Sequence, residues 1–370
     1  MRLRSKGKPI TEGDKMSVED LRRKIDEVDV QIVKLIGERV RIAEEIGKEK
    51  KEQGKQIEDR EREAGVLKNV GSIAQKENIN QEDIEGIYRQ IIATSKRIEE
   101  IRVAFQGEVG AYSEEAAFRF FGPSIQSEPY ETLDDVFKVV ERGEMPFGIV
   151  PIENSLEGSI GRVYDLLLDS SLKVYGEIEL RIVHCLITNP GARLDSIKKV
   201  YSHPQALGQC RTFLKHLDCE VIPTSNTASS AKMIKETGVV DAAAVASVRA
   251  ADIYGMQILA REIEDTPNNS TRFFILAKED SPPSGNDKTS VVFSLKDRPG
   301  TLYDSLKEFA IRNINLTKIE SRPTRQKPWE YNFYLDFAGH RDDKASKEAL
   351  ENLDRSSRFM KILGSYPKAK

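Results

Sequence analysis

The chain has 370 residues, which at ~150 residues per domain allows two or three domains. Hydrophobic residues make up 39% and charged residues 32%, so there is enough apolar material for folded cores, and wholesale disorder is excluded. Lys and Arg total 57 against 60 Asp and Glu. The resulting net charge of −3 argues against a protein that coats nucleic acid or an anionic membrane.

No uncharged apolar run approaches the ~18 residues that a membrane span needs. The segment 1–15 is basic but has no apolar stretch, so we expect a protein that is not exported. The three cysteines have no zinc-type spacing and the four histidines are scattered. This pattern predicts a reducing, cytoplasmic setting with no disulfide and no metal centre.

From position 17 to about 100 the chain is charged, lacks Pro, and is typical of helix throughout. Ser17 is the predicted N-cap, and apolar residues then recur every three or four positions from Leu21 to Ile46. A helix carried to Lys51 would be ~50 Å long. The two further helices, predicted over 59–75 and from Asn80 to about 100, are too short to cover that apolar stripe, so we expect a helical dimer.

Cations interrupt this stripe. Arg39 occupies a position that the spacing assigns to Leu or Ile, Lys50 continues the same line, and Arg22 flanks its start. A buried guanidinium is costly without an anion, so Arg39 either pairs with a helix carboxylate or helps to bind a small dicarboxylate. Ser95 and Glu99 follow the apolar face of the third helix and favour the second interpretation.

The string LRRKIDEVDVQIVKLIGERVRIAEEIGKEK resembles the first helix of the all-helical chorismate mutase family. The resemblance implies an intramolecular rearrangement of chorismate to prephenate, with Lys50 and Glu99 as catalytic residues beside the breaking ether bond. The chorismate-binding residues that it implies are Arg22, Arg39, Lys50, Asp59, Arg62, Glu63, Ser95 and Glu99. An offset alignment would use Arg60 and Glu61 instead, but it places Ile57 where Asp belongs. Since Glu99 donates a hydrogen bond only when protonated, we expect mutase activity to fall as the pH rises into the alkaline range.

Over 101–279 short β-rich runs, among them LRIVHCLI at 180–187, alternate with helical patterns, which predicts an α/β domain with a mostly parallel sheet and room for two lobes. Polar clusters follow three of the runs, at 151–155, at 202–205 with Gln209 one turn later, and at 269–273. Each cluster alone is typical of caps and turns, but ligands of open α/β sheets also bind at strand ends.

The strings VAFQGEVGAYSEEAA, GIVPIENSLEGSIG, VYSHPQALGQC and NNSTRFFIL closely resemble prephenate dehydratase. That family has two lobes like a type II periplasmic binding protein, with the active site between them, and converts prephenate to phenylpyruvate by loss of CO2 and the ring hydroxyl. The catalytic residues implied are Thr271, against the leaving hydroxyl, with Asn154, Ser202 and Gln209. The prephenate-binding residues implied are Asn154, Ser155, Ser202, His203, Gln209, Thr271, Arg272 and Phe273. Whether His203, Glu153 or water supplies the proton stays open.

Residues 280–288 are dense in Pro, Ser, Gly and charge and predict a linker, and 289–366 has the βαββαβ order of a ferredoxin-like unit. Taken alone, its turn at 297–300 is that of a capped helix and Trp329 is a core residue. The unit also resembles the ACT amino-acid-binding domain. The phenylalanine-binding residues implied are Glu320, Ser321, Arg322 and Pro323, with Gly300, Thr301, Leu302 and Tyr303. The second group departs at two of four positions from the family's usual Gly-Ala-Leu-Val.

The sequence therefore predicts a multidomain protein: an all-α domain at 17–100, an α/β two-lobed domain at 101–279 and an α+β ACT domain at 289–366. The predicted function is a bifunctional chorismate mutase and prephenate dehydratase of phenylalanine biosynthesis, inhibited by L-phenylalanine. It would need no cofactor, and its partners would be chorismate, prephenate and copies of itself, not nucleic acid or membrane. The alternatives are a dehydratase that prefers arogenate and a non-catalytic amino-acid sensor.

Overall fold

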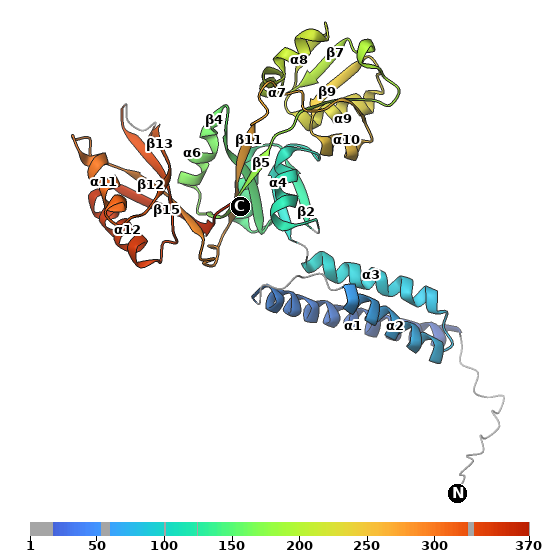
Figure 1. The fold of residues 1–370 in the computed structure, drawn as a ribbon. Coiled ribbons are helices and arrows are strands. Elements are labelled where there is room, and N and C mark those ends of the chain that lie inside the picture. The colour runs from blue at the N-terminus through green and yellow to red at the C-terminus, as the bar shows by residue number, and fades with distance from the viewer. Residues whose placement is uncertain (1–17, 53–59, 100, 124, 325–328, 370) are drawn as a thin grey trace, which may run out of the picture. The chain divides into compact units, whose positions relative to one another are not determined.

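The computed structural model describes residues 18–52, 60–99, 101–123, 125–324 and 329–369 (Figure 1). The chain divides into two compact units, residues 1–100 and 101–370, and each is described by itself. Among the described residues, no helix combines the length and the apolar character that crossing a bilayer requires.

The first unit is helical, as predicted. It contains α1 (Val18–Glu52), α2 (Arg60–Lys76) and α3 (Gln81–Glu99). Asn80 caps α3, because its side-chain oxygen accepts a hydrogen bond of 2.8 Å from the backbone N–H of Glu82. The predicted N-cap Ser17 lies outside the described residues.

Helix α1 keeps its apolar stripe in solvent within the single chain. The stripe residues are between 47% and 63% exposed, with Ile25 at 60% and Leu35 at 63%. Helix α2 packs against α3, and Val70, Ala74 and Ile92 form the small buried core of the unit. The described unit therefore leaves the apolar face of α1 uncovered over most of the length of the helix.

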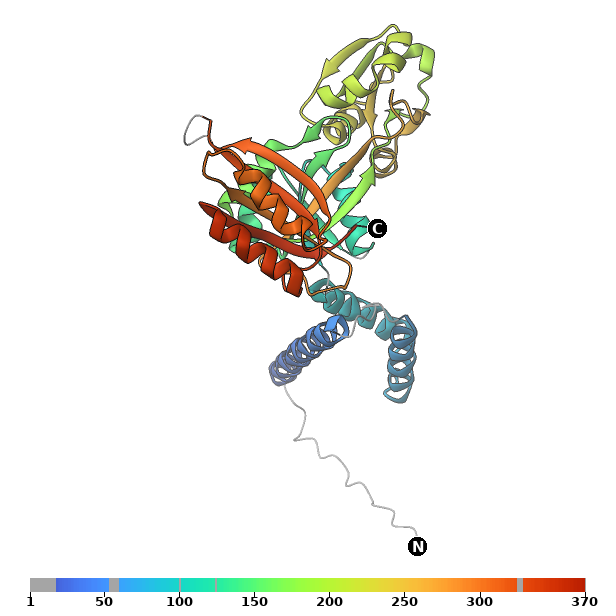
Figure 2. The ribbon, with the colours of Figure 1, turned by 60° about the vertical axis from the view of Figure 1, so that its left-hand side comes forward.

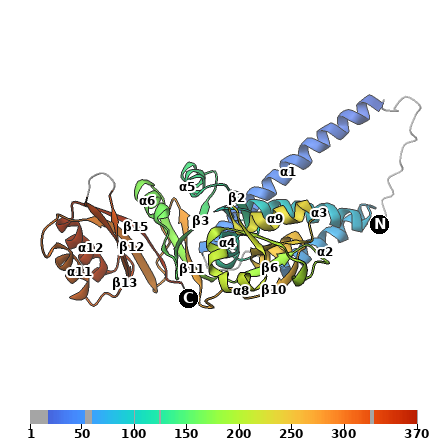
Figure 3. The same ribbon diagram turned by 90° about the horizontal axis from the view of Figure 1, so that it is seen from above.

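The second unit begins with a lobe built on a sheet of order β2-β1-β3-β11-β5. Its strands are β1 (Arg102–Gln106), β2 (Gln126–Tyr130), β3 (Phe147–Asn154), β5 (Lys173–Arg181) and β11 (Ser270–Ala277), with the short β4 (Gly158–Ser159) paired to β3. Helices α5 (Leu133–Arg142) and α6 (Gly161–Asp169) cover one face and α4 (Tyr112–Phe121) the other (Figure 3).

The second lobe has a sheet of order β10-β6-β9-β7-β8. Its strands are β6 (Cys185–Thr188), β7 (Lys199–Ser202), β8 (Glu220–Pro223), β9 (Ala242–Ala246) and β10 (Gln257–Ala260). Its helices are α7 (Pro204–Gln209), α8 (Arg211–His216), α9 (Thr227–Thr237) and α10 (Val248–Tyr254), with a short 3-10 turn at Leu194–Ser196.

Both sheets are mixed, but four of the five strands in each order run in the same direction, so the expectation of a mostly parallel sheet is confirmed. In the first lobe β2, β1 and β3 run parallel, whereas β11 is antiparallel to β3 and β5. The second lobe repeats this mixture, with β6 antiparallel to β9 and β10. The reason is that the chain crosses between the lobes twice. The run 180–187, expected as one strand, is split by the first crossing into the end of β5 and the start of β6.

Close backbone contact joins the lobes beside the first crossing. A Cβ at Gly110, whose φ is +93°, would lie 3.0 Å from the backbone of Ala250 in α10. The Ser247 hydroxyl donates to the carbonyl oxygen of Gly110, and the Arg249 guanidinium pairs with buried Glu114 at 2.9 Å. Glycine is required here because a side chain would separate the lobes.

The C-terminal domain has the predicted βαββαβ order. Its elements are β12 (Asp287–Ser294), α11 (Thr301–Ala310), β13 (Leu316–Pro323), β14 (Tyr331–Ala338), α12 (Lys344–Ser356) and β15 (Phe359–Pro367). The sheet order is β13-β14-β12-β15, with both helices on one face (Figure 2). Trp329 is 85% exposed, so the reading of this residue as core is wrong.

The other face of this sheet shares a core with the first lobe. Val292, Tyr334, Leu363 and Tyr366 belong to the same buried cluster as the residues under α5 and α6. A Cβ at Gly364 would collide with the carbonyl oxygen of Val174 on β5, so the two sheets touch through their backbones. This common core explains why residues 101–370 form one compact unit.

Candidate active site

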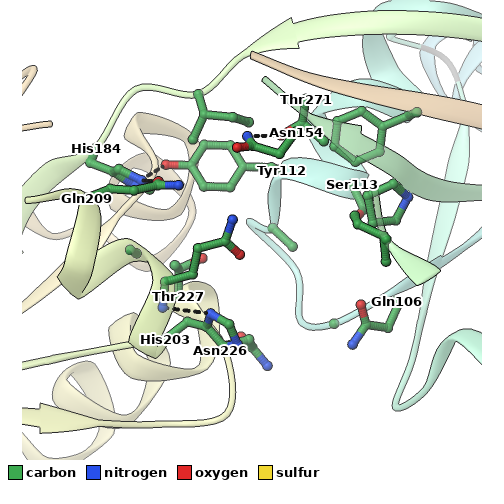
Figure 4. Close-up of a pocket in the computed structure, with 18 residues that line it drawn as sticks. Gln106, Tyr112, Ser113, Asn154, His184, His203, Gln209, Asn226, Thr227 and Thr271 are labelled. Carbon is green, nitrogen blue, oxygen red and sulfur yellow. Dashed lines mark hydrogen bonds between the residues drawn. The ribbon is translucent and has the colours of Figure 1, made fainter. Parts of the chain in front are cut away.

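A cavity of about 200 Å³ lies between the two lobes of the second unit (Figure 4). The first lobe contributes the ends of β1, β3 and β11 and the start of α4, and the second lobe contributes α7 and the start of α9. The described polar residues that line it are Gln106, Tyr112, Ser113, Asn154, His184, His203, Gln205, Gln209, Asn226, Thr227 and Thr271. None of the described lining residues is Asp, Glu, Lys or Arg.

The two longer helices that reach this cleft do so with their N-termini. Helix α4 starts at Tyr112, and its N-cap residue, Ala111, has no side chain that can cap the first turn. Helix α9 starts at Thr227 from the opposite lobe. Helix N-termini carry partial positive charge and free backbone N–H groups, so an uncharged cleft with this geometry favours an anionic ligand.

Asn154 fixes the direction of the hydrogen bonds in the cleft. Its side-chain oxygen accepts from the backbone N–H groups of Leu156 at 3.0 Å and Glu157 at 3.1 Å. Its amide nitrogen must therefore donate in the other direction, to Thr271 Oγ1 at 3.0 Å and Asn269 Oδ1 at 2.7 Å. Thr271 is an acceptor toward Asn154, which leaves its own O–H proton for a group in the cleft.

The same chain of bonds sets the protonation of a buried histidine. Asn269 donates to Gln209 Oε1 at 2.9 Å, and this oxygen also lies 2.9 Å from His184 Nε2, which must carry the proton. Burial lowers the pKa of His184, so its ring is neutral and Nδ1 is bare. Nδ1 lies 3.0 Å from the hydroxyl of Tyr112, which can donate to it or to the carbonyl oxygen of Val183 at 2.8 Å.

Gln209 is left with a free donor. Its Nε2 is buried and has no hydrogen-bond partner among the described residues. A buried amide without a partner costs free energy, so this nitrogen is suited to a ligand oxygen in the cleft.

The structure brings together five of the predicted dehydratase residues at this cavity, namely Asn154, His203, Gln209, Thr271 and Phe273. It gives other partners to the remaining three. The Ser155 hydroxyl bridges the backbone at Asn268 and Ser270, and the fully buried Ser202 donates to Val245 O at 2.6 Å. Arg272 lies outside the lining and pairs with three carboxylates.

Sequence reasoning missed several lining residues. Tyr112 and Ser113 stand inside the quoted motif VAFQGEVGAYSEEAA, but nothing marked them as facing a ligand. His184 lies within the run 180–187, which was predicted to be a single strand, so nothing indicated that it faces a ligand. Asn226 has the ordinary signal of an N-cap, since its side chain accepts from the backbone N–H of Ser229.

The predicted mutase residues are only partly described. Arg22 and Arg62 are exposed and Arg39 is half-buried. Lys50, Glu63, Ser95 and Glu99 lie on the three helices, but their side chains fall outside the described residues, as does all of Asp59.

The two predicted phenylalanine motifs lie on different elements of the C-terminal domain. Gly300, with φ +87°, is the N-cap of α11, which Thr301, Leu302 and Tyr303 begin, and Tyr303 is 68% exposed. Glu320, Ser321, Arg322 and Pro323 end the edge strand β13. The Arg322 guanidinium pairs with Asp165 of α6 at 3.3 Å, and Glu320 accepts a hydrogen bond from Ser159.

Comparisons with known proteins agree with this architecture. Family models match at residues 21–100 (chorismate mutase type II), 103–281 (prephenate dehydratase) and 289–355 (ACT domain). The bifunctional chorismate mutase/prephenate dehydratase of Stutzerimonas stutzeri is 38% identical over 368 residues, covering 97% of this chain and 100% of that protein. The chain belongs to this bifunctional family. Its three domains have the predicted fold classes.

Further relatives match a shorter part of the chain. A chloroplastic arogenate dehydratase/prephenate dehydratase of Arabidopsis thaliana is 45% identical over 278 residues, covering 72% of this chain and 73% of that protein. The L-Phe complex of prephenate dehydratase from Arthrobacter aurescens has a TM-score of 0.67 at 33% identity, covering 72% of this chain and 90% of that chain. The structure of GqqA, a quorum quenching acylase, gives the same score and identity and covers 72% and 97%.

The state of His184 is directly measurable. Because burial lowers its pKa, we expect its ring to stay neutral below the ordinary histidine value of about 6.5 and to carry its proton on Nε2. Nitrogen-15 NMR of the selectively labelled histidines reports both properties. A neutral ring with its proton on Nδ1 would contradict the hydrogen-bond directions derived above, and titration above pH 6.5 would contradict the effect of burial on the pKa.

Proposed function

We propose that this chain converts chorismate to prephenate in its helical unit and prephenate to phenylpyruvate in the cleft of its dehydratase domain. One observation supports the second activity, namely a cleft lined by uncharged side chains. In this cleft the Thr271 hydroxyl is free to donate a hydrogen bond, and the N-termini of α4 and α9 are suited to bind an anionic substrate. The match of the chain to its bifunctional relative over nearly its full length supports the pairing of the two activities.

In the dehydration, prephenate itself supplies both the leaving hydroxyl and the electron pair that expels it. When the ring carboxylate departs as CO2, its electron pair enters the ring and expels the hydroxyl. We assign Thr271 to the departing oxygen, because its oxygen accepts from Asn154, which leaves its own O–H to donate as negative charge develops there. Gln209 Nε2 and the N-termini of α4 and α9 are assigned to the substrate's oxygens.

We leave Ser155, Ser202 and Arg272 out of the substrate-binding set, because none of the three is among the residues that line the cleft. His203 stays in it. Its Nδ1 accepts from the backbone N–H of Gln205 at 3.3 Å, so in the neutral ring Nε2 carries the proton and can donate within the cleft.

For the mutase we keep the eight predicted residues, Arg22, Arg39, Lys50, Asp59, Arg62, Glu63, Ser95 and Glu99. Cations spaced along the apolar stripe of α1 suit a substrate with two carboxylates. The rearrangement requires only that the protein hold the substrate in its reactive conformation and stabilise the charge that develops. No prosthetic group takes part in either proposed reaction.

The exposed stripe of α1 supports a dimer. A second copy packed along it would bury apolar side chains from Leu21 to Ile46 that the single chain leaves about half exposed. We propose that this pairing completes the helical unit.

L-Phenylalanine is the proposed effector, and the eight residues of the two ACT motifs are its proposed ligands. The phenylalanine complex of the Arthrobacter relative supports this choice. The cytoplasm is the proposed location, since Cys185, Cys210 and Cys219 are all free thiols.

Arogenate is the second candidate substrate, because the Arabidopsis relative is named for both acids. Arogenate carries an ammonium group where prephenate carries a ketone. The described lining offers no carboxylate to pair with that ammonium, so we favour prephenate.

A single coupled assay tests the function. Purified protein given chorismate alone should form phenylpyruvate, and added L-phenylalanine should inhibit its formation. Prephenate that accumulates without phenylpyruvate would contradict the dehydratase assignment, and unchanged chorismate would contradict the mutase assignment.

Asn154→Asp tests the donor role of Thr271. An aspartate still accepts from Leu156 and Glu157, but it cannot donate to Thr271, whose proton would then turn toward the carboxylate. We expect the dehydratase kcat to fall at least ~100-fold with mutase activity unchanged. The matched control is Asn268→Asp, the same change at an exposed position two residues before Ser270. Equal activity of the two variants would contradict the assignment.

The dimer is tested by charge on the stripe. Ile25→Glu combined with Ile32→Glu should convert a dimer to monomers, measured by light scattering after size exclusion, because carboxylates would replace the buried contacts. Lys34→Glu with Arg41→Glu, on the opposite face of α1, is the control and should keep the dimer mass. Dissociation by the control pair alone would show that the wrong face was chosen.

A further inference from the structure

A buried group of charges joins the dehydratase domain to the ACT domain. The guanidinium of Arg272 on β11 lies 2.8 Å from Asp336 on β14 and 3.3 Å from Glu177 on β5. The side chains of Arg272, Asp336 and Glu177 are 11%, 7% and 0% exposed, and none of them lines the cleft. Charges so far from water are tolerated only when paired.

This group is one residue away from the reaction centre. In the pairing of β11 with β3, Thr271 lies opposite Asn154 and Arg272 lies opposite Glu153. Since successive side chains of a strand point to opposite faces, consecutive residues carry the hydroxyl in the cleft and the guanidinium in the interdomain core. The position of Arg272 therefore constrains the position of Thr271.

Of the three carboxylates around Arg272, Asp336 is the one that pairs with Arg272 and with no other cation among the described residues. Glu177 also binds Lys288 at 2.6 Å, and Glu153 also binds Lys318 at 2.9 Å. Burial alone would lower the pKa of Arg272, but Asp336 and its neighbours raise it above its ordinary value, so the guanidinium stays charged.

Hydrogen bonds within the ACT domain orient the carboxylate of Asp336. The hydroxyl of Ser290 on β12 donates to Asp336 Oδ1 at 2.6 Å, and Ser290 shares a second hydrogen bond of 2.6 Å with the hydroxyl of buried Tyr366. The carboxylate is thus fixed by two strands of the ACT sheet, β12 and β15, besides its own.

We propose that Asp336 is a positioning residue for dehydration: it holds Arg272, and through the strand it holds Thr271 at the leaving hydroxyl. The ACT domain then completes the dehydratase site rather than only covering it. Movement of the ACT sheet would reach the reacting atoms through this ion pair. Because this role is defined for dehydration, it rests on the proposed function.

The test is a double-mutant cycle between Asp336→Asn and Thr271→Ala in the full chain. A misplaced catalytic group costs rate more than binding, so Asp336→Asn should lower the dehydratase kcat at least ~10-fold while KM changes less than ~3-fold. In the Thr271→Ala background, where no hydroxyl remains to be positioned, the same substitution should change kcat less than ~2-fold.

Two further variants keep the test decisive. Ser290→Ala removes only the hydroxyl that orients Asp336, and should give a smaller loss of kcat that also vanishes in the Thr271→Ala background. Asp354→Asn, an exposed position on α12, is the control and should change neither kcat nor KM. If Asp336→Asn does not fold, the Ser290→Ala cycle gives the answer.

Three results would overturn the proposal. The first is an unchanged kcat in folded Asp336→Asn. The second is an equal loss in both backgrounds, which is the sign of a merely structural role. The third is failure of the wild-type chain to dehydrate prephenate, which overturns the proposed function and this role together. The first two results leave the proposed function intact.

Discussion

The hydrogen bonds that Asn154 accepts from two backbone N–H groups determine the chemistry of the dehydratase cleft. Because the amides of Leu156 and Glu157 can only donate, the side chain of Asn154 has one possible orientation. That orientation makes Thr271 an acceptor inside the protein and a donor toward the cleft. It also determines, through Asn269 and Gln209, which nitrogen of His184 carries the proton. The backbone turn that follows β3 thus determines the donor direction of Thr271 and the nitrogen of His184 that carries the proton.

Charge is separated across β11. The cleft face has neutral side chains and helix N-termini, which suit a ligand that brings two negative charges of its own. The opposite face has Arg272 in a dry cluster of carboxylates supplied by both domains. A free arginine in the cleft would bind the carboxylate that must leave as CO2 and would stabilise the ground state. Placing the cation on the far face keeps the strand anchored without that cost.

Much of this architecture could be predicted from the sequence, and the failures have physical causes. The helices, the βαββαβ order of the ACT domain and five cleft residues follow from periodicity, turn chemistry and motif resemblance. The resemblance to prephenate dehydratase assigned Arg272 to the substrate, but strand alternation places its side chain on the face of β11 opposite Thr271. His184 was missed because the first crossing between the lobes, where the run 180–187 breaks, leaves no Gly or Pro in the sequence to mark it. Asp336, which pairs with the buried Arg272, lies 64 residues further along the chain, so no local sequence pattern predicts that the two residues meet.

The donor role of Thr271 is the central claim, and one comparison tests it most directly. Single-turnover dehydration of prephenate by Thr271→Val, which keeps the shape and removes the hydroxyl, should be slower than wild type by ~1,000-fold or more. Thr271→Ser, which keeps the hydroxyl, should stay within ~10-fold of wild type. A valine variant as fast as the serine variant would contradict the account.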